Sequence, residues 1–195
     1  RVLFRSRSGH YSAVKLKVRD GFLIVTLCWI VSVLLGAMPF MLSGSIPNFF
    51  DAFFESCSGF STTGASILTD IESLPKSILF WRSFTHWIGG MGILIFAIAL
   101  MPSLGISGQN IAVSEAPGPT LDKITPKMSD TAKFLYVTYI IFTLAETILL
   151  RLGGMSLYDA LIHTFGSVGT GGFSNYNDSV AHFDSAYIDI VITIF

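Results

Sequence analysis

Long apolar segments alternate with short, partly apolar ones along this chain of 195 residues. Residues 21–42 carry no charged side chain, and as a helix they are long enough to cross about 30 Å of hydrocarbon. Residues 77–101 and 131–152 are further segments of spanning length, and another apolar run begins at Ser185. The pattern predicts an all-α polytopic membrane protein surrounded by membrane lipid.

Two shorter segments lie between these spans. Residues 47–60 place phenylalanines at near-helical spacing but are too short to cross a bilayer, and residues 158–167 are similar. Each is followed by a Gly/Thr loop, at 61–66 and at 168–174. Backbone without regular structure is tolerated at membrane depth only where protein buries it or where it lines a wet cavity. Two re-entrant half-helices that end in such loops therefore predict a pore lined by loop carbonyls, and hence ion permeation.

The arrangement is repeated along the chain. Asp51 corresponds to Asp159 at an offset of 108, whereas Gly64 corresponds to Gly171 at an offset of 107, so we expect one deletion inside the second half-helix. The expected division has four parts: a cytoplasmic N-terminal segment (1–20), a first span–pore-loop–span unit (21–102), a cytoplasmic connector (103–130) and a second unit truncated in its last span (131–195). Residues 1–6 resemble a translated sequencing adapter and carry no fold argument.

Composition and charge agree with a membrane protein. Apolar residues make up 51% and charged residues 13% of the chain, against roughly 25% charged in soluble domains. Basic residues concentrate before the first span and in the connector, so the positive-inside rule predicts a cytoplasmic N-terminus. The opposite side carries carboxylates, which would raise the cation concentration near the pore mouth. No basic run is interleaved with aromatic residues, so we expect no nucleic-acid partner.

Backbone carbonyls and threonine hydroxyls are the ligands that the two loops offer. Rings of carbonyls can replace the water shell of a monovalent cation, and glycine permits the backbone conformations that aim successive carbonyls at one axis. Neither loop contains Cys, His or a carboxylate, which argues against a transition-metal or calcium site. No nucleophile–base pair is evident, so we expect neither enzyme activity nor a cofactor.

Polar and small residues inside the predicted spans are expected to have structural roles. Arg82 and His86 belong to an aromatic and basic mixture typical of a membrane interface, and we expect His86 to be an interface or packing histidine rather than a proton relay. Glu146 would snorkel or pair with Arg151 near the outer end of its span. The glycines within 89–92 would allow close approach of a neighbouring helix.

Several separate motifs carry a resemblance to a known family. They are DAFFE at 51–55, SGFSTTGA at 58–65, WR at 81–82, WIGGMG at 87–92, EAPGP at 115–119 and TGGFS at 170–174. Together they resemble the Trk-type potassium uptake subunits of bacteria, within the wider Trk/Ktr/HKT superfamily. The resemblance covers nearly the whole chain from about residue 18 onward.

This resemblance implies potassium transport, with potassium as substrate and no cofactor, by the translocating subunit of a Trk-type uptake system in the bacterial inner membrane. Permeation would be passive or coupled to another ion by symport. The resemblance also implies four span–pore-loop–span units around one pore, a homodimer and a cytoplasmic nucleotide-binding regulatory subunit. Carried over by motif, the potassium-binding filter positions are Thr62, Thr63, Gly64, Gly169, Thr170 and Gly171.

Two alternatives remain open from the residues. A re-entrant-loop solute pore of the aquaporin kind would need Asn-Pro-Ala at the half-helix tips, and neither loop has it. A membrane-embedded enzyme or a non-conducting membrane scaffold would use the repeats only for packing. Rubidium flux measured against water or glycerol flux would separate the three possibilities.

Overall fold

The computed structural model describes residues 18–100 and 128–195, and it describes side chains for residues 22–92 and 133–195. The predictions made for residues 1–17 and for most of the connector, 101–127, lie outside this description. All regular structure in the described ranges is helical, as the sequence predicts.

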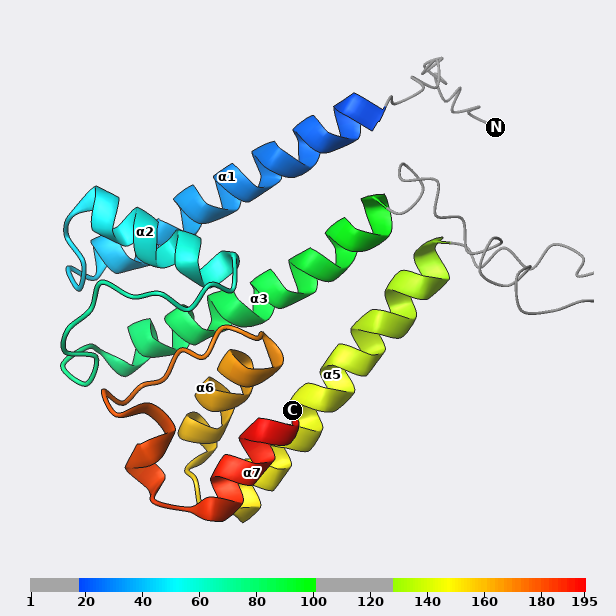
Figure 1. The fold of residues 1–195 in the computed structure, drawn as a ribbon. Helices are drawn as coiled ribbons and strands as arrows, with labels where there is room; N and C mark the ends of the chain where they lie inside the picture. The colour runs from blue at the N-terminus through cyan, green and yellow to red at the C-terminus, as the bar shows by residue number, and fades with distance from the viewer. Residues whose placement is uncertain (1–17, 101–127) are drawn as a thin grey trace, which may run out of the picture.

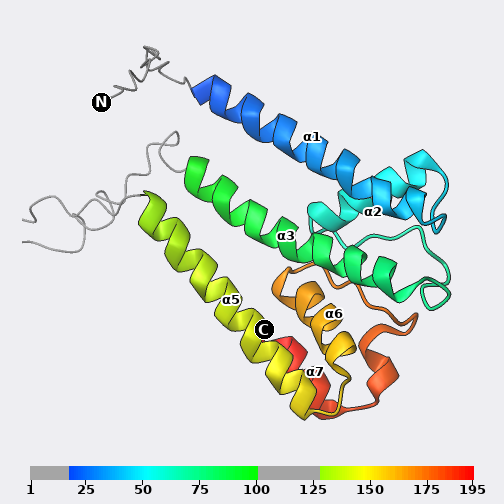
Figure 2. The same cartoon turned by 180° about the vertical axis from the view of Figure 1, so that it is seen from behind.

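Long and short helices alternate in the order that the apolar pattern predicts. Three helices of 25 residues each lie side by side in Figures 1 and 2: α1 (Val18–Leu42), α3 (Lys76–Leu100) and α5 (Met128–Leu152). The shorter helices gather at one end: α2 (Phe49–Phe60), α6 (Leu157–Val168), the 3-10 helix η2 (Ser179–Phe183) and α7 (Ala186–Ile194). The half-helices α2 and α6 thus return the chain toward α3, α2 after the long helix α1 and α6 after the long helix α5.

The long helices present apolar faces that the described chain does not cover. Phe22–Leu42 of α1 and Lys133–Leu152 of α5 have the length and hydropathy of membrane spans, with mean hydropathies of 2.3 and 1.6. Only 17% and 22% of these windows are buried, whereas the core helix of a soluble protein would be mostly buried. Such apolar surfaces require lipid or further protein around them.

The two half-helices have the same length and the same kinds of ends. Each has 12 residues. At the start of α2 the side chain of Asn48 accepts a hydrogen bond from the Phe50 amide, and Ser156 does the same for the Asp159 amide of α6. Because the two half-helices are equally long, the prediction of a deletion inside the second one is wrong. The offset between the two helices is 108 at both ends.

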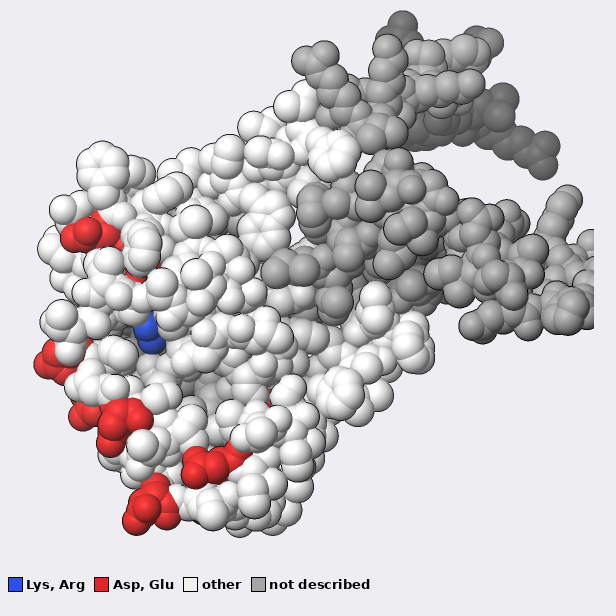
Figure 3. Space-filling model, viewed as in Figure 1, with Lys and Arg blue, Asp and Glu red and all other residues white. Residues whose placement is uncertain are grey.

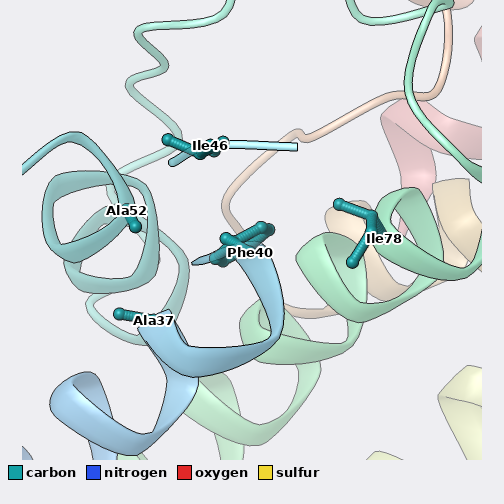
Figure 4. Packing of buried hydrophobic residues seen from close by; sticks show 5 residues of the cluster. All are labelled: Ala37, Phe40, Ile46, Ala52 and Ile78. Carbon is teal, nitrogen blue, oxygen red and sulfur yellow. The ribbon is translucent and has the colours of Figure 1, made fainter. Parts of the chain in front are cut away.

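Each half-helix packs on its own small apolar core. In the first unit, Figure 4 shows Phe40 of α1 between Ile46, Ala52 of α2 and Ile78 of α3. The second unit has a separate cluster, made of Leu150, Met155, Ala160, Ile188 and Val191. The two cores fix each half-helix against the long helices of its own unit.

Helix α3 also joins the first unit to the second. Trp87 donates to the Thr143 hydroxyl of α5 at 3.0 Å, and the Tyr139 hydroxyl donates to the Trp87 carbonyl at 3.0 Å. The ring of Phe165 on α6 lies 5.7 Å from the rings of Phe84 and Trp87. These contacts place the end of α6 against the middle of α3, and the end of α2 meets α3 where Phe60 lies against Gly89.

Candidate functional site

The loops that follow α2 and α6 have the same backbone conformation. Thr62 and Thr170 both adopt positive φ, at 53° and 62°, and Gly64 and Gly172 do so at 75° and 82°. These pairs are each separated by 108 positions. The structural counterpart of Thr62–Gly64 is therefore Thr170–Gly172. The register suggested by residue identity, which pairs Gly64 with Gly171, is wrong by one residue.

The first amides of each loop donate hydrogen bonds to carbonyls at the end of the preceding half-helix. The amides of Thr62 and Thr170 donate to carbonyls three residues earlier, at 3.1 and 2.8 Å. The next amides, of Thr63 and Gly171, donate to carbonyls five residues earlier, at 3.0 and 2.9 Å. Among the described residues no hydrogen bond reaches a carbonyl of 62–64 or 170–172. The loops therefore present free carbonyl oxygens, the ligand type that suits a dehydrated alkali cation.

The two loops meet each other. A Cβ atom built on Gly64 would overlap the carbonyl oxygen of Gly171. Figures 1 and 2 show the C-terminal ends of α2 and α6 directed toward the middle of α3. Helix C-termini carry partial negative charge, so both half-helices favour a cation near the place where the loops meet.

The positive φ of two threonines is a strained feature of the loops. A β-branched residue rarely adopts this conformation, and backbone strain of this kind is concentrated at functional sites. Thr62 and Thr170 occupy the same place in their loops, directly after the residue that caps the half-helix. The repetition indicates that the strained conformation serves the loop geometry.

Relief of this strain is expected to stabilise the protein. Replacing Thr62 by glycine should raise its free energy of unfolding by about 0.5–1 kcal/mol, because glycine adopts positive φ without a steric cost. Thr63→Gly is the matched control, since Thr63 has ordinary φ and should lose stability on the same substitution. Thermal unfolding in detergent compares the two, and a lower midpoint for Thr62→Gly would contradict the strain argument.

Carboxylates surround the loops at this end of the molecule. Asp70, Glu72, Asp178 and Asp184 are exposed there, and Figure 3 shows acidic side chains spread over this end with very little basic surface between them. Such a field raises the local concentration of cations. The described residues contain no group of three or more His, Cys, Asp or Glu arranged to hold a metal ion.

Comparison with known proteins agrees with this geometry. A family profile described as a cation transport protein, TrkH, matches residues 3–195. The chain belongs to the TrkH family of cation transport proteins. It is 46% identical over 184 residues to the Trk system potassium uptake protein TrkH of Escherichia coli K12, and 39% identical over 182 residues to TrkG of the same organism. These matches cover 93% and 92% of the chain but 38% of either relative.

A solved structure of the family has the same fold. The potassium transporter TrkH from Vibrio parahaemolyticus superimposes with a TM-score of 0.78 at 40% identity, over 93% of this chain and 36% of that one. The resemblance to Trk-type subunits and the all-α membrane fold are thereby confirmed. The role of individual loop residues in this TrkH-family chain stays a prediction.

Two polar residues expected at a membrane interface instead lie behind the second loop. Arg82 and His86 are 2% and 0% exposed, so the interface prediction is wrong for Arg82, and of the two roles expected for His86 the structure supports packing. The His86 ring stacks on Phe173 at 3.8 Å, and a Cβ on Gly171 would meet that ring. Neither imidazole nitrogen has a hydrogen-bond partner among the described atoms. His86 therefore acts as a flat packing surface for the loop.

Glu146 neither snorkels nor pairs with Arg151, in contrast to the sequence-based expectation. It is fully buried, and it accepts a hydrogen bond from the Ser167 hydroxyl near the end of α6. Arg151 instead donates to the Met155 carbonyl at 2.7 Å. The reason is tertiary, since α6 packs on the face of α5 that carries Glu146. This carboxyl holds the end of the second half-helix in the TrkH-family fold.

Asp159 connects the start of α6 to the segment after the second loop. Its carboxylate accepts from the Asn175 amide at 2.8 Å and from the Ser156 hydroxyl at 2.6 Å. Burial and the nearby Asp159 carboxylate raise the pKa of the Tyr176 phenol above its usual value, so the phenol stays protonated and donates to Asp159 at 3.4 Å. These bonds hold Asn175 and Tyr176, in the segment where the chain returns from the second loop (its return segment), against the half-helix.

Proposed function

We propose that this chain supplies two filter loops of the potassium-translocating subunit of a Trk-type uptake system, in which cations pass between backbone carbonyls. One observation carries the proposal: two loops of equal backbone conformation meet at Gly64 and Gly171, with carbonyls that accept no hydrogen bond within the described ranges. Support for potassium comes from the relatives, which are named potassium uptake proteins.

The filter positions follow from the register of the two loops. The six positions expected from motifs are Thr62, Thr63, Gly64, Gly169, Thr170 and Gly171. With the offset of 108, the proposed carbonyl ligands are those of Thr62–Gly64 and Thr170–Gly172. Gly169 caps α6 as Ser61 caps α2, so it lies at the base of the second loop.

The wider architecture belongs to the same proposal. Residues 21–102 and 131–195 would form two of four units around one pore, joined by a cytoplasmic connector, with the N-terminus also cytoplasmic. The subunit would lie in the bacterial inner membrane as a homodimer, together with a cytoplasmic nucleotide-binding regulatory subunit. The charge asymmetry of the sequence and the acidic end that bears the loops support this orientation.

A chimaeric transporter tests the proposed function. Residues 18–195 of this chain would replace the matching segment of Vibrio parahaemolyticus TrkH, and the purified chimaera would be reconstituted in liposomes. We expect rubidium uptake that excess potassium suppresses, with water and glycerol permeability equal to that of empty liposomes. Solute flux without rubidium uptake would favour a solute pore, and no flux at all would favour a scaffold; either result would reject the proposal.

The chain alone provides the comparison for the chimaera. It holds two loops of the proposed ring, and half a ring would leave loop carbonyls without ligands or partners. We therefore expect no rubidium uptake above background from the isolated chain at equal protein. Potassium-sensitive uptake by the isolated chain would show that a four-loop ring is unnecessary.

A further inference from the structure

A buried ion pair lies between the two loops. Glu55 of α2 is 0% exposed, and its carboxylate accepts a hydrogen bond from Nε of Arg82 on α3 at 2.6 Å. The same carboxylate accepts from the Ser66 hydroxyl at 2.9 Å and from the Ile67 amide at 3.2 Å. Glu55 therefore holds Ser66 and Ile67, where the chain returns from the first loop; we call this its return segment.

Arg82 makes the corresponding contacts with the second loop. Its Nη1 donates to the Ser174 carbonyl at 3.1 Å, and the guanidinium carbon lies 3.4 Å from the centroid of the Phe173 ring. A planar guanidinium can serve a carboxylate, a carbonyl and an aromatic face at once, which a lysine ammonium cannot do. The pair thus connects the return segments of both loops through two side chains.

Equivalent side chains bind equivalent serines in the two units, at an offset of 108. Ser66 and Ser174 are equivalent positions, and so are Glu55 and His163. His163 makes a 3.1 Å hydrogen bond between its Nε2 and the Ser174 hydroxyl, as Glu55 does with Ser66. A half-helix side chain therefore holds the serine after each loop. In the second unit this side chain is an imidazole, whereas in the first it is a carboxylate, whose burial requires a cation.

We propose that Glu55 and Arg82 are positioning residues that hold the two loops at a fixed spacing and thereby set the discrimination between potassium and sodium. The inference rests on the proposed function. Carbonyls held at a fixed separation fit the larger ion and cannot close around the smaller one. Arg82 joins the two return segments through buried contacts directly behind the loops, whereas Asn177 joins them farther along, through exposed hydrogen bonds to residues 70–72. Loss of the guanidinium should therefore loosen the spacing of the two loops.

Arg82→Lys in the chimaera is the decisive variant. The lysine keeps a positive charge beside the Glu55 carboxylate but lacks the guanidinium group whose Nη1 donates to the Ser174 carbonyl. We expect the ratio of rubidium to sodium uptake to fall about ten-fold, because the free energy of one charge-assisted hydrogen bond corresponds to about this factor. The amount of folded protein should change little. Arg151→Lys is the matched control, because it loses a similar side-chain bond to the Met155 carbonyl far from the loops. Its uptake ratio should equal that of the unmodified chimaera.

A neutral pair gives a second, independent test. The double variant Glu55→Gln with Arg82→Gln leaves no unpaired buried charge, so it decides the matter if Arg82→Lys fails to reach the membrane. We expect it too to lower the rubidium-to-sodium ratio. An unchanged ratio in either variant that is folded and takes up rubidium would overturn the positioning role. Failure of the proposed function is a different result, since the unmodified chimaera would then show no potassium-sensitive uptake.

Discussion

Replacing Gly64 by alanine is expected to lower rubidium uptake by the chimaera about a hundred-fold. Gly64 has a φ of 75°, which costs an alanine about 1 kcal/mol or more, and the new Cβ would overlap the carbonyl oxygen of Gly171. That oxygen belongs to the backbone of the second loop, so it cannot move aside as a flexible side chain would. Displacing it costs about 1–3 kcal/mol and moves a proposed ligand. Initial rates of rubidium uptake at equal protein measure the effect.

Gly44 offers a matched control for this substitution. Its φ is 72°, close to that of Gly64, but a Cβ there would meet nothing within 4 Å. Gly44→Ala therefore carries the same conformational cost without the overlap, and we expect uptake close to that of the unmodified chimaera. Equal uptake by Gly64→Ala and Gly44→Ala would mean that the contact between the two loops does not matter for permeation. A loss confined to Gly64→Ala supports the shared site.

The helices could be predicted from the sequence because local rules decide them. Apolar runs of spanning length become α1 and α5, and the first half-helix begins near the expected Pro47–Asn48, with Asn48 as the cap. Helix α7, where a fourth span is expected to begin, starts at Ala186, directly after the expected Ser185. Length, hydropathy and capping residues are all properties of neighbouring positions, so no tertiary contact is needed to recognise them.

The register of the two loops could not be read from residue identity. Thr63-Gly64 matches Thr170-Gly171 letter for letter, and this match suggests an offset of 107. Backbone conformation instead aligns Thr62 with Thr170, because each is the first residue beyond the cap of a half-helix of equal length. The helix end sets where the loop begins, and the number of threonines before the glycine varies between the two copies.

The residues behind the loops were missed for a different reason. Arg82 and Glu146 lie near the ends of their spans, where charged side chains usually reach water. Their burial follows from the packing of α2 and α6 against α3 and α5, which no local pattern shows. Asn177 is a further example: its side chain accepts a hydrogen bond from the Ile71 amide at 2.8 Å, across 106 positions of sequence. Contacts between units require the tertiary structure.

Gly89→Ala is expected either to prevent folding or to lower the free energy of unfolding by about 3 kcal/mol or more. Gly89 lies in the middle of α3 against the last residue of α2, and a Cβ there would overlap the carbonyl group of Phe60 and lie 3.1 Å from its Cα. Phe60 cannot move aside, since its backbone ends the half-helix and starts the first loop. Alanine would force α3 away from α2, at a cost of about 3 kcal/mol or more. Yield of monodisperse protein and the thermal midpoint in detergent measure the loss.

Gly92→Ala separates close helix approach from the general effect of losing a glycine. Gly92 lies one turn further along α3, where among the described side chains a Cβ would touch only the Trp29 ring of α1, at 3.3 and 3.4 Å. A side chain can shift by a few tenths of an ångström, and alanine favours the helix by about 1 kcal/mol over glycine. Gly92→Ala should therefore keep its yield and midpoint. If Gly89→Ala behaved in the same way, α3 would not need to touch the end of α2, and the placement of the first loop by that contact would be wrong.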